Sequence, residues 1–362
     1  MPDVIDPVFR TATVMAALLL ATTLVIAGRR RPAALPGAML CLAAAAFFVT
    51  SASGAGAALG AMGYVLTAVC VTKAVWFWLL ARTLFVDGAQ LRTRHIALAI
   101  AVSIVGTWQQ KAFLPHFRAG STSALENVAA FGFESLLLVL VSLGLYEAWR
   151  GMTTDLVERR RHLRLGFIAA TGVYLAATLA VQSHNLVLST TTPALAALAN
   201  MTFVAVGCLI ATWQMLQPRR ETWLDQTPRT DVDALTPAES VVRVNLENAI
   251  ERERVFVQEG LTIGALAAHL SVAEPVLRRV INQGLGYRNF NDFLHAVRIR
   301  EACAELARPE LARQPVLSIA MNVGYGSIGA FNRAFKSRVG VTPTDYRRSA
   351  TKRAGEHLES SA

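Results

Sequence analysis

Two segments near the C-terminal end of the sequence carry basic and amide side chains on one side of an expected helix. In Glu274–Gly284, apolar residues recur at helical spacing and predict an inward face. The outward side chains are then Arg278, Arg279, Asn282 and Gln283. In Ile328–Arg338 the same pattern leaves four outward residues, counting the expected N-cap: Ser327, Asn332, Arg333 and Lys336. Since such side chains bind DNA phosphates and base edges, we expect both helices to contact double-stranded DNA.

A supporting helix and a tight turn are expected before each of these segments. Ile263–Leu270 and Val316–Val323 have core-facing residues at helical spacing, and each contains an alanine where a second helix would pack closely. The turns are Ser271–Ala273 and Gly324–Gly326. A longer helix, Asn291–Ala307, separates the two helix-turn-helix motifs. Its roughly 17 residues would span about 25 Å, which suits two recognition helices near the ~34 Å spacing of successive major-groove faces.

Three stretches of this region carry the pattern of a known family: LTIGALAAHLSVAEPVLRRVIN, GLGYRNFNDFLHAVRIREA and LSIAMNVGYGSIGAFNRAFKSRVGVTPTDYRR. They resemble the AraC/XylS transcription regulators over about Leu261–Arg348. The closing pattern is specific to that family: Gly324-Tyr325, Ser327, Phe331, Arg333, Phe335-Lys336, Gly340, Thr342-Pro343 and Tyr346-Arg347. The resemblance implies two helix-turn-helix motifs that read one extended DNA site. Gly329 and Ala330 depart from it by giving the second recognition helix few polar groups at its start.

The charge of this region agrees with nucleic-acid binding. Between Ser271 and Arg353 there are fourteen Lys or Arg residues and six Asp or Glu residues. The whole chain has a net charge of +10 and a pI near 10.0. An excess of cations around two helix-turn-helix motifs predicts the neutralisation of DNA phosphates.

The first 216 residues have the composition of a membrane protein. The chain is only 17% charged, against about 25% for an average soluble chain, and the deficit lies before Gln217. A helix needs about 20 mostly apolar residues to cross the hydrocarbon core. Seven segments predict a bundle of seven transmembrane helices: about Val8–Gly28, Ala33–Ala52, Ala57–Ala81, His95–Phe113, Asn127–Trp149, Leu165–Ser183 and Thr192–Leu216.

The basic residues between these segments predict their orientation. Clusters follow every odd-numbered segment: Arg29, Arg30 and Arg31; Arg82, Arg92 and Arg94; Arg150, Arg159, Arg160, Arg161 and Arg164; Arg219 and Arg220. The opposite side has only Arg10, Lys111 and Arg118. Lys and Arg are retained on the cytoplasmic side. We therefore expect a multi-pass protein of the cell (inner) membrane, with its N-terminus outside and its DNA-binding part in the cytoplasm.

Two ionisable residues fall in the middle of expected spans, Lys73 and Glu134. Charged groups at membrane depth are costly and are usually paired or face a cavity. One interpretation is an intramembrane polar site for a ligand or a proton. The other is a structural ion pair or a lysine that reaches toward the interface.

The predicted organisation is all-α: a transmembrane domain over residues 1–216, a linker over 217–236, an AraC-type domain over 237–350 and a disordered tail over 351–362. We find no catalytic motif, and neither the histidines nor Cys41, Cys70, Cys208 and Cys303 form a metal pattern, so no enzyme activity, metal or cofactor is expected. The expected partners are double-stranded DNA, the lipid bilayer, a small-molecule or protein signal and a second copy in a homodimer. The alternatives are helices that only anchor or oligomerise the regulator, and a transporter with a DNA-binding module.

Overall fold

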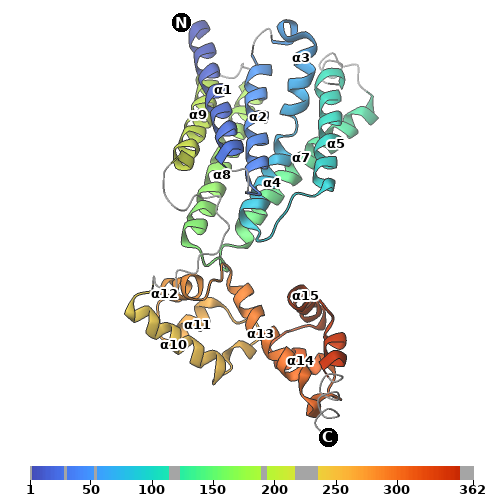
Figure 1. The fold of residues 1–362 in the computed structure, drawn as a ribbon. Coiled ribbons are helices and arrows are strands. Elements are labelled where there is room, and N and C mark those ends of the chain that lie inside the picture. The colour runs from blue at the N-terminus through green and yellow to red at the C-terminus, as the bar shows by residue number, and fades with distance from the viewer. Residues whose placement is uncertain are drawn as a thin grey trace. The chain divides into compact units, whose positions relative to one another are not determined.

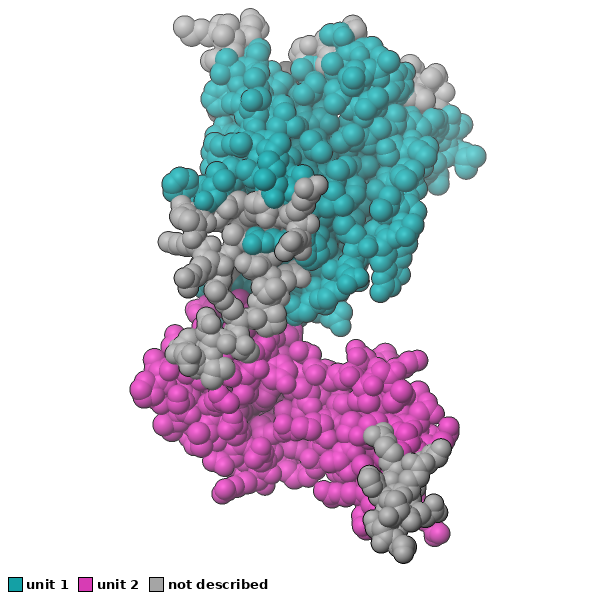
Figure 2. All heavy atoms as spheres, in the orientation of Figure 1, with its two compact units in different colours: residues 1–152, 159–226 teal, residues 153–158, 227–362 magenta. Residues whose placement is uncertain are grey.

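The computed structural model describes residues 2–27, 31–52, 55–113, 123–188, 194–216 and 235–350. Within these residues the regular structure is helical, apart from one isolated β-bridge. The chain divides into two compact units (Figure 2): an N-terminal unit of residues 1–152 and 159–226, and a C-terminal unit of residues 153–158 and 227–362. The short segment 153–158 therefore belongs to the C-terminal unit, although the residues on both sides of it belong to the N-terminal one.

The helices of the N-terminal unit follow the apolar segments of the sequence (Figure 1). They are α1 Pro2–Ala27, α2 Ala34–Thr50, α3 Ala55–Cys70, α4 Lys73–Phe85, α5 Thr93–Trp108, the π-helix η1 Gln109–Phe113, α7 Ala124–Arg150, α8 Glu158–Leu188 and α9 Ala194–Leu216. The third predicted segment is divided at Val71–Thr72, between α3 and α4. The fourth ends in the π-helix.

Each predicted membrane segment is helical where the structure describes it, but not every helix has the length of a span. Three stretches are long and apolar enough to cross a membrane: Asp6–Ile26, Ala58–Phe85 and Ala124–Arg150. Two further apolar helices, Ala34–Thr50 and Leu198–Trp213, are shorter. The 17 residues of α2 rise only about 25 Å, against a hydrocarbon core of about 30 Å. The prediction of seven spans is therefore supported in part, by these three stretches.

Small residues allow the helices of the N-terminal unit to pack closely. Ala17 and Ala21 of α1 and Ala38 and Ala45 of α2 are buried in one cluster. Large apolar side chains face outward instead, and both Ile26 and Leu125 are 79% exposed. Small residues at helix interfaces and apolar residues outside are typical of helices in lipid.

An arginine of α8 closes the ends of two other helices in this unit. The guanidinium of Arg164 donates hydrogen bonds to the carbonyl oxygens of Glu147 at 3.0 Å, Ala148 at 2.9 Å and Phe85 at 2.7 Å. These oxygens lie in the last turns of α7 and α4, where carbonyls lack intrahelical partners and favour a cation. A Cβ at Gly151 would lie 2.5 Å from Arg164 Nη2, so a larger residue at the end of α7 would have to displace the guanidinium.

The C-terminal unit consists of short helices arranged along one longer helix (Figure 1). They are α10 Pro237–Glu251, η3 Val255–Val257, α11 Ile263–His269, α12 Glu274–Arg279, the π-helix η4 Val280–Gly284, α13 Phe290–Ala307, η5 Pro309–Leu311, α14 Val316–Asn322 and α15 Ile328–Val339. The helices predicted for both helix-turn-helix motifs and for the connection between them are all present.

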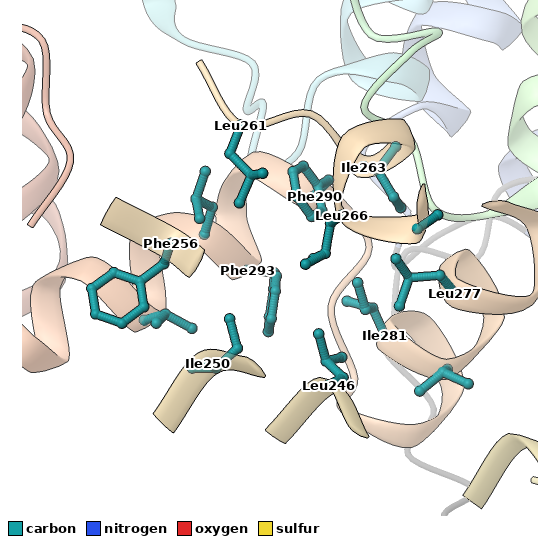
Figure 3. Packing of buried hydrophobic residues seen from close by; sticks show 14 of the residues in the cluster. Leu246, Ile250, Phe256, Leu261, Ile263, Leu266, Leu277, Ile281, Phe290 and Phe293 are labelled. Atoms are coloured by element: carbon teal, nitrogen blue, oxygen red, sulfur yellow. The ribbon is translucent and has the colours of Figure 1, made fainter. Parts of the chain in front are cut away.

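Two hydrophobic cores share α13. The first surrounds its N-terminal half, where Phe290 and Phe293 meet Leu246, Leu266 and Ile281 from α10, α11 and η4 (Figure 3). The second surrounds its C-terminal half and contains residues of α14 and α15. One rigid helix therefore positions both motifs.

The roughly helical spacing of Val241, Val244, Ile250 and Val257 predicts one helix over Pro237–Gln258, but the helix is shorter. A capping box of Thr236 and Glu239 begins α10 as an N-terminal signal should, but the helix ends at Glu251. Arg254 then adopts a left-handed conformation with φ of 52°, which turns the chain and places Phe256 in the first core at 3% exposure. Because the apolar residues keep a helical spacing through the turn, the sequence does not distinguish one long helix from a helix that is followed by a 3-10 turn.

Candidate nucleic-acid interface

The second helix-turn-helix motif presents all four of its predicted residues at the surface. α14 and α15 pack through residues with no exposed area: Ile319, Ala320, Phe331 and Phe335. Asn332, Arg333 and Lys336 lie on the exposed side of α15. Ser327 is also exposed, and its Oγ accepts a hydrogen bond from the Ala330 amide at 3.3 Å. Its established part in the structure is therefore the cap of α15.

The small residues at the start of α15 leave space for an arginine. A Cβ at Gly329 would lie 3.4 Å from Arg333 Nη1, so the guanidinium lies beside the first turn of the helix. The N-terminal part of a recognition helix is the part that contacts base edges, and its free amides favour anions. Arg333 thus supplies the charge that Gly329 and Ala330 do not.

The turn between α14 and α15 is fixed from both sides. Gly324 has a φ of +88°, and a Cβ there would lie 2.6 Å from the carbonyl oxygen of Val257. Next to it, Tyr325 is buried and its Oη lies 2.8 Å from Nδ1 of His295 on α13. Burial lowers the pKa of His295, as do Arg298 and Arg338, whereas Asp292 raises it. Burial also raises the pKa of Tyr325 to about 12. The two rings are therefore both neutral near pH 7.

The first helix-turn-helix motif has the predicted core but different surroundings for its polar residues. Leu277, Val280 and Ile281 have no exposed area, which agrees with the predicted inward face. Its outward polar residues already have partners or partial cover. Arg279 remains half exposed, with its Nε donating to the Glu239 carboxylate at 2.5 Å. Asn282 donates to the Tyr287 carbonyl oxygen at 2.9 Å, and Gln283 is half-buried.

Arg278 corrects the prediction of an outward side chain, because it is only 6% exposed. Its guanidinium donates to the carbonyl oxygen of Asp155 at 2.6 Å and to that of Thr153 at 2.9 Å. Its Nε also donates to the Glu274 carboxylate at 2.8 Å. The helical face was predicted correctly, but a segment more than a hundred residues earlier in the chain covers it.

That segment, Thr153–Glu158, is called the docked loop below. Asp155 forms an antiparallel bridge with Asn289. A backbone hydrogen bond lies on each side of this bridge, and each is 2.9 Å long. In one the Leu156 amide donates to the Arg288 carbonyl, and in the other the Phe290 amide donates to the Thr154 carbonyl. The Leu156 side chain is 3% exposed and belongs to the first core. The only sequence signal for this contact is Leu156-Val157, the two apolar residues of the otherwise polar docked loop.

Several of the basic residues between Ser271 and Arg353 form hydrogen bonds within the protein. Arg298 is buried, and it donates to the carbonyl oxygens of Phe256 and Gln258, each at 2.8 Å. Arg338 donates to the Asp292 carbonyl oxygen at 2.7 Å. Fewer basic residues are therefore available to DNA than the fourteen in the sequence of this region. Those that are exposed include Arg333 and Lys336 on α15.

Lys73 and Glu134 lie in the N-terminal unit and line the same cavity. Lys73 Nζ lies 4.7 Å from the ring centroid of Phe47. Glu134 Oε1 accepts a hydrogen bond from Gln109 Nε2 at 3.1 Å. In the part of the chain that the structure describes, no ion pair joins Lys73 to Glu134. Within the same residues, no group of three or more His, Cys, Asp or Glu could hold a metal ion.

Two helix-turn-helix motifs held on one helix define a DNA-binding domain of the AraC type. A family model described as a helix-turn-helix domain matches residues 266–349. The regulatory protein SoxS of Escherichia coli is 29% identical over 91 residues, which are 25% of this chain and 81% of SoxS, in both strain K12 and O157:H7. Among solved structures, the C-terminal domain of AraT, a response regulator from Geobacillus stearothermophilus, has 32% sequence identity over 32% of this chain and 88% of that chain, with a TM-score of 0.26.

The C-terminal part of this chain is therefore an AraC-type helix-turn-helix domain, as its sequence predicts. Each of these matches covers at most 32% of the chain.

Proposed function

We propose that the protein is a membrane-bound, sequence-specific DNA-binding transcription regulator whose apolar helices sense a signal. The DNA-binding part rests on the AraC-type domain and on the exposed face of α15. The membrane part rests on three long apolar helices with large apolar side chains on the outside. The distribution of arginines along the sequence favours a cytoplasmic C-terminus, which is the compartment that contains the DNA.

The docked loop is the observation that carries the sensing part of this proposal. It connects α7 to α8, yet it supplies Leu156 to the core of the DNA-binding domain and two carbonyl oxygens to Arg278. A displacement of α7 relative to α8 would reach the loop through the chain itself. Helices that served only as an anchor would need a covalent linker and no such contact.

We infer from these contacts that the first recognition helix has two states, of which the structure holds the one with the loop docked. With the loop docked, the guanidinium of Arg278 is occupied by carbonyl oxygens and is not free to bind a phosphate. With the loop released, the same guanidinium would become available to DNA, as the sequence suggests. A signal that stabilises one arrangement of α7 and α8 over another would therefore change the affinity for DNA.

Genome-wide mapping of the sites bound by the intact, tagged chain tests the DNA-binding part. We expect discrete enriched sites that are lost in Arg333→Ala and kept in Arg313→Ala, an exposed arginine outside both recognition helices. The chain should also stay in the membrane fraction after alkaline extraction. A lack of enriched sites would contradict the regulator, and release into the soluble fraction would contradict the membrane part.

Helices that only anchor or oligomerise the regulator remain the competing function. Replacing Thr153–Val157 with five Gly and Ser residues separates the two, provided that the altered chain still occupies its mapped sites. If the helices sense a signal, transcription from those sites changes. An unchanged level of transcription, with unchanged occupancy, supports the anchor.

A further inference from the structure

The N-terminal unit contains a cavity of about 320 Å³ with a mixed polar and apolar wall. The charged residues that line the cavity are two lysines, Lys73 and Lys111, and one carboxylate, Glu134. Aromatic rings of Phe47 and Phe133 form part of the apolar wall. A volume of this size is within the range of pockets for small organic molecules.

Irregular backbone surrounds this cavity on two sides. Val71 and Lys73 line it from the interruption between α3 and α4, while Gln109, Gln110 and Lys111 line it from the π-helix η1. Interrupted helices are tolerated at membrane depth where the backbone is buried or lines a cavity. Short π-helical segments occur frequently at functional sites. Both departures from regular helix therefore coincide with the same cavity.

A buried amide in the wall has an unsatisfied acceptor. Gln109 is 8% exposed, and its Nε2 donates to Glu134 Oε1 at 3.1 Å. The carboxylate only accepts, so the amide nitrogen must face it and the amide oxygen must point elsewhere. Gln109 Oε1 is buried without a hydrogen-bond partner. Since this oxygen is buried, a ligand reaches it only when the Gln109 side chain turns toward the cavity, and a hydrogen-bond donor on the ligand would then satisfy it.

The two lysines lack carboxylate partners in the described residues. Lys73 Nζ lies 4.7 Å from the Phe47 ring centroid, and Lys111 Nζ lies 5.4 Å from that of Tyr64. Aromatic faces attract ammonium groups but do not neutralise them. Two ammonium groups and one carboxylate leave the wall with a net positive charge. The complementary occupant is an anion.

We propose that this cavity binds a small organic acid that also carries a hydrogen-bond donor. The ammonium groups of Lys73 and Lys111 hold its anionic group, and Gln109 Oε1 accepts its donor. Its apolar body lies against Phe47 and Phe133. The role of this site as the sensing site rests on the proposed function, whereas the binding itself does not.

Calorimetric titration of the intact chain in phosphatidylcholine nanodiscs tests this site with three matched probes. 4-Hydroxyphenylacetate carries the anion, the donor and an apolar body, phenylacetate lacks the donor, and tyramine replaces the anion with a cation. We expect the first to bind at millimolar concentration or below, the second at least fivefold more weakly, and the third not at all. Absence of binding by both acids, or binding of tyramine with equal affinity, would overturn the proposal.

Variants of the wall separate a built site from general partition into the bilayer. Lys73→Met and Lys111→Met should each weaken 4-hydroxyphenylacetate at least tenfold, whereas Gln109→Met should abolish the difference between the two acids. Ser135→Ala is the control, because Ser135 follows Glu134 on α7 and does not line the cavity. Equal binding by all the variants and the control would overturn the site.

One further measurement identifies the source of the anion, and the assay itself keeps the two proposals apart. Phosphatidylglycerol has a phosphate and hydroxyl groups in its headgroup, so its addition to the nanodiscs displaces the probe if a lipid is the natural occupant. If it leaves the binding unchanged, a soluble acid is the occupant. Because no DNA is present, binding can succeed while DNA recognition fails, and the reverse result is equally distinguishable.

Discussion

Arg278 and Arg333 belong to the two recognition helices, but they differ in what surrounds them. Arg333 is exposed beside the first turn of α15, whereas Arg278 is held by the carbonyl oxygens of Thr153 and Asp155. Helical periodicity predicts the face on which a side chain lies. It does not predict whether a distant segment covers that face. For a single residue, availability to DNA is therefore a property of tertiary packing.

Arg333→Ala should weaken operator binding by about 1–3 kcal/mol if the guanidinium contacts a base. If it contacts only a phosphate, binding to all sequences should weaken similarly and the dependence on salt should become less steep. Gel-shift titrations of the intact chain at two salt concentrations distinguish the two cases. Arg313→Ala serves as the matched control, and equal affinity of both variants would contradict the placement of α15 on DNA.

His295 should make the stability of the DNA-binding domain depend on pH. The unfolded chain takes up a proton near the ordinary pKa of about 6.5, but burial and two nearby arginines lower the pKa of the folded His295. The unfolded state therefore binds more protons in the window below pH 6.5, and stability falls as the pH falls through it. The slope is at most about 1.4 kcal/mol per pH unit, the value for one proton.

Chemical unfolding of the domain within the intact chain, measured at several values between pH 7.5 and 5.5, tests this dependence. His295→Gln should lower stability at pH 7.5, because the contact with Tyr325 is lost, and should flatten the slope. A slope that persists in the variant would assign the pH dependence to other groups.

At the scale of elements, the helices of the DNA-binding domain were predictable because each has a strong local signal. α11 and α14 have apolar residues at helical spacing, and α15 has a serine N-cap and ends at Gly340 in a left-handed conformation. The docked loop has no such signal, because a backbone bridge between Asp155 and Asn289 depends on proximity and not on side-chain type. The interruption at Val71–Thr72 was equally hidden, since it lies inside Ala58–Phe85, a stretch apolar enough as a whole to cross a membrane.

A disulfide across the bridge would test whether the docked loop controls DNA binding. Asp155 and Asn289 face each other between two flanking hydrogen bonds, a position where Cα atoms are about 4.5 Å apart and a disulfide can form. In a chain without its four cysteines, we expect oxidised Asp155→Cys/Asn289→Cys to bind operator DNA roughly tenfold more weakly than the reduced form, because Arg278 stays occupied.

The reduced double variant and the single Asn289→Cys variant, given the same oxidising treatment, are the controls for this measurement. Asn289 also caps α13, so the single variant accounts for any loss of the cap. Equal binding by the oxidised and reduced forms would show that release of the loop is not required.

At the scale of the molecule, composition predicted two environments and the structure divides the chain into two units. The predicted boundary at residues 217–236 was based on composition, and residues 217–234 of it lie outside the described residues. Composition could not assign residues 153–158 to the C-terminal unit, because six residues have too little hydrophobic surface to be distinguished from an ordinary connection. Arg29, Arg30, Arg219 and Arg220, which support the predicted orientation, also lie outside the described residues, as does Arg118 of the opposite side.

The predicted orientation can be measured by labelling single cysteines in a chain without its native ones. Gln90→Cys, between α4 and α5, should react with a membrane-impermeant maleimide only after the cells are permeabilised. Ala124→Cys, at the start of α7, should react in intact cells, since both positions are exposed in the structure. The opposite pattern would place the C-terminal unit outside the cell and exclude a role in transcription.

The docked loop is covalently part of the chain that it covers, and this fixes how it would compete with DNA for Arg278 under the proposed function. Docking is unimolecular, so the effective concentration of the loop at Arg278 is set by the stretch of chain that joins the two, which runs through α8, α9 and residues 217–236. Changes in the number of protein copies in the cell leave that value unchanged. Overproduction would raise the number of chains that search the genome, but the fraction of them with Arg278 covered would stay the same.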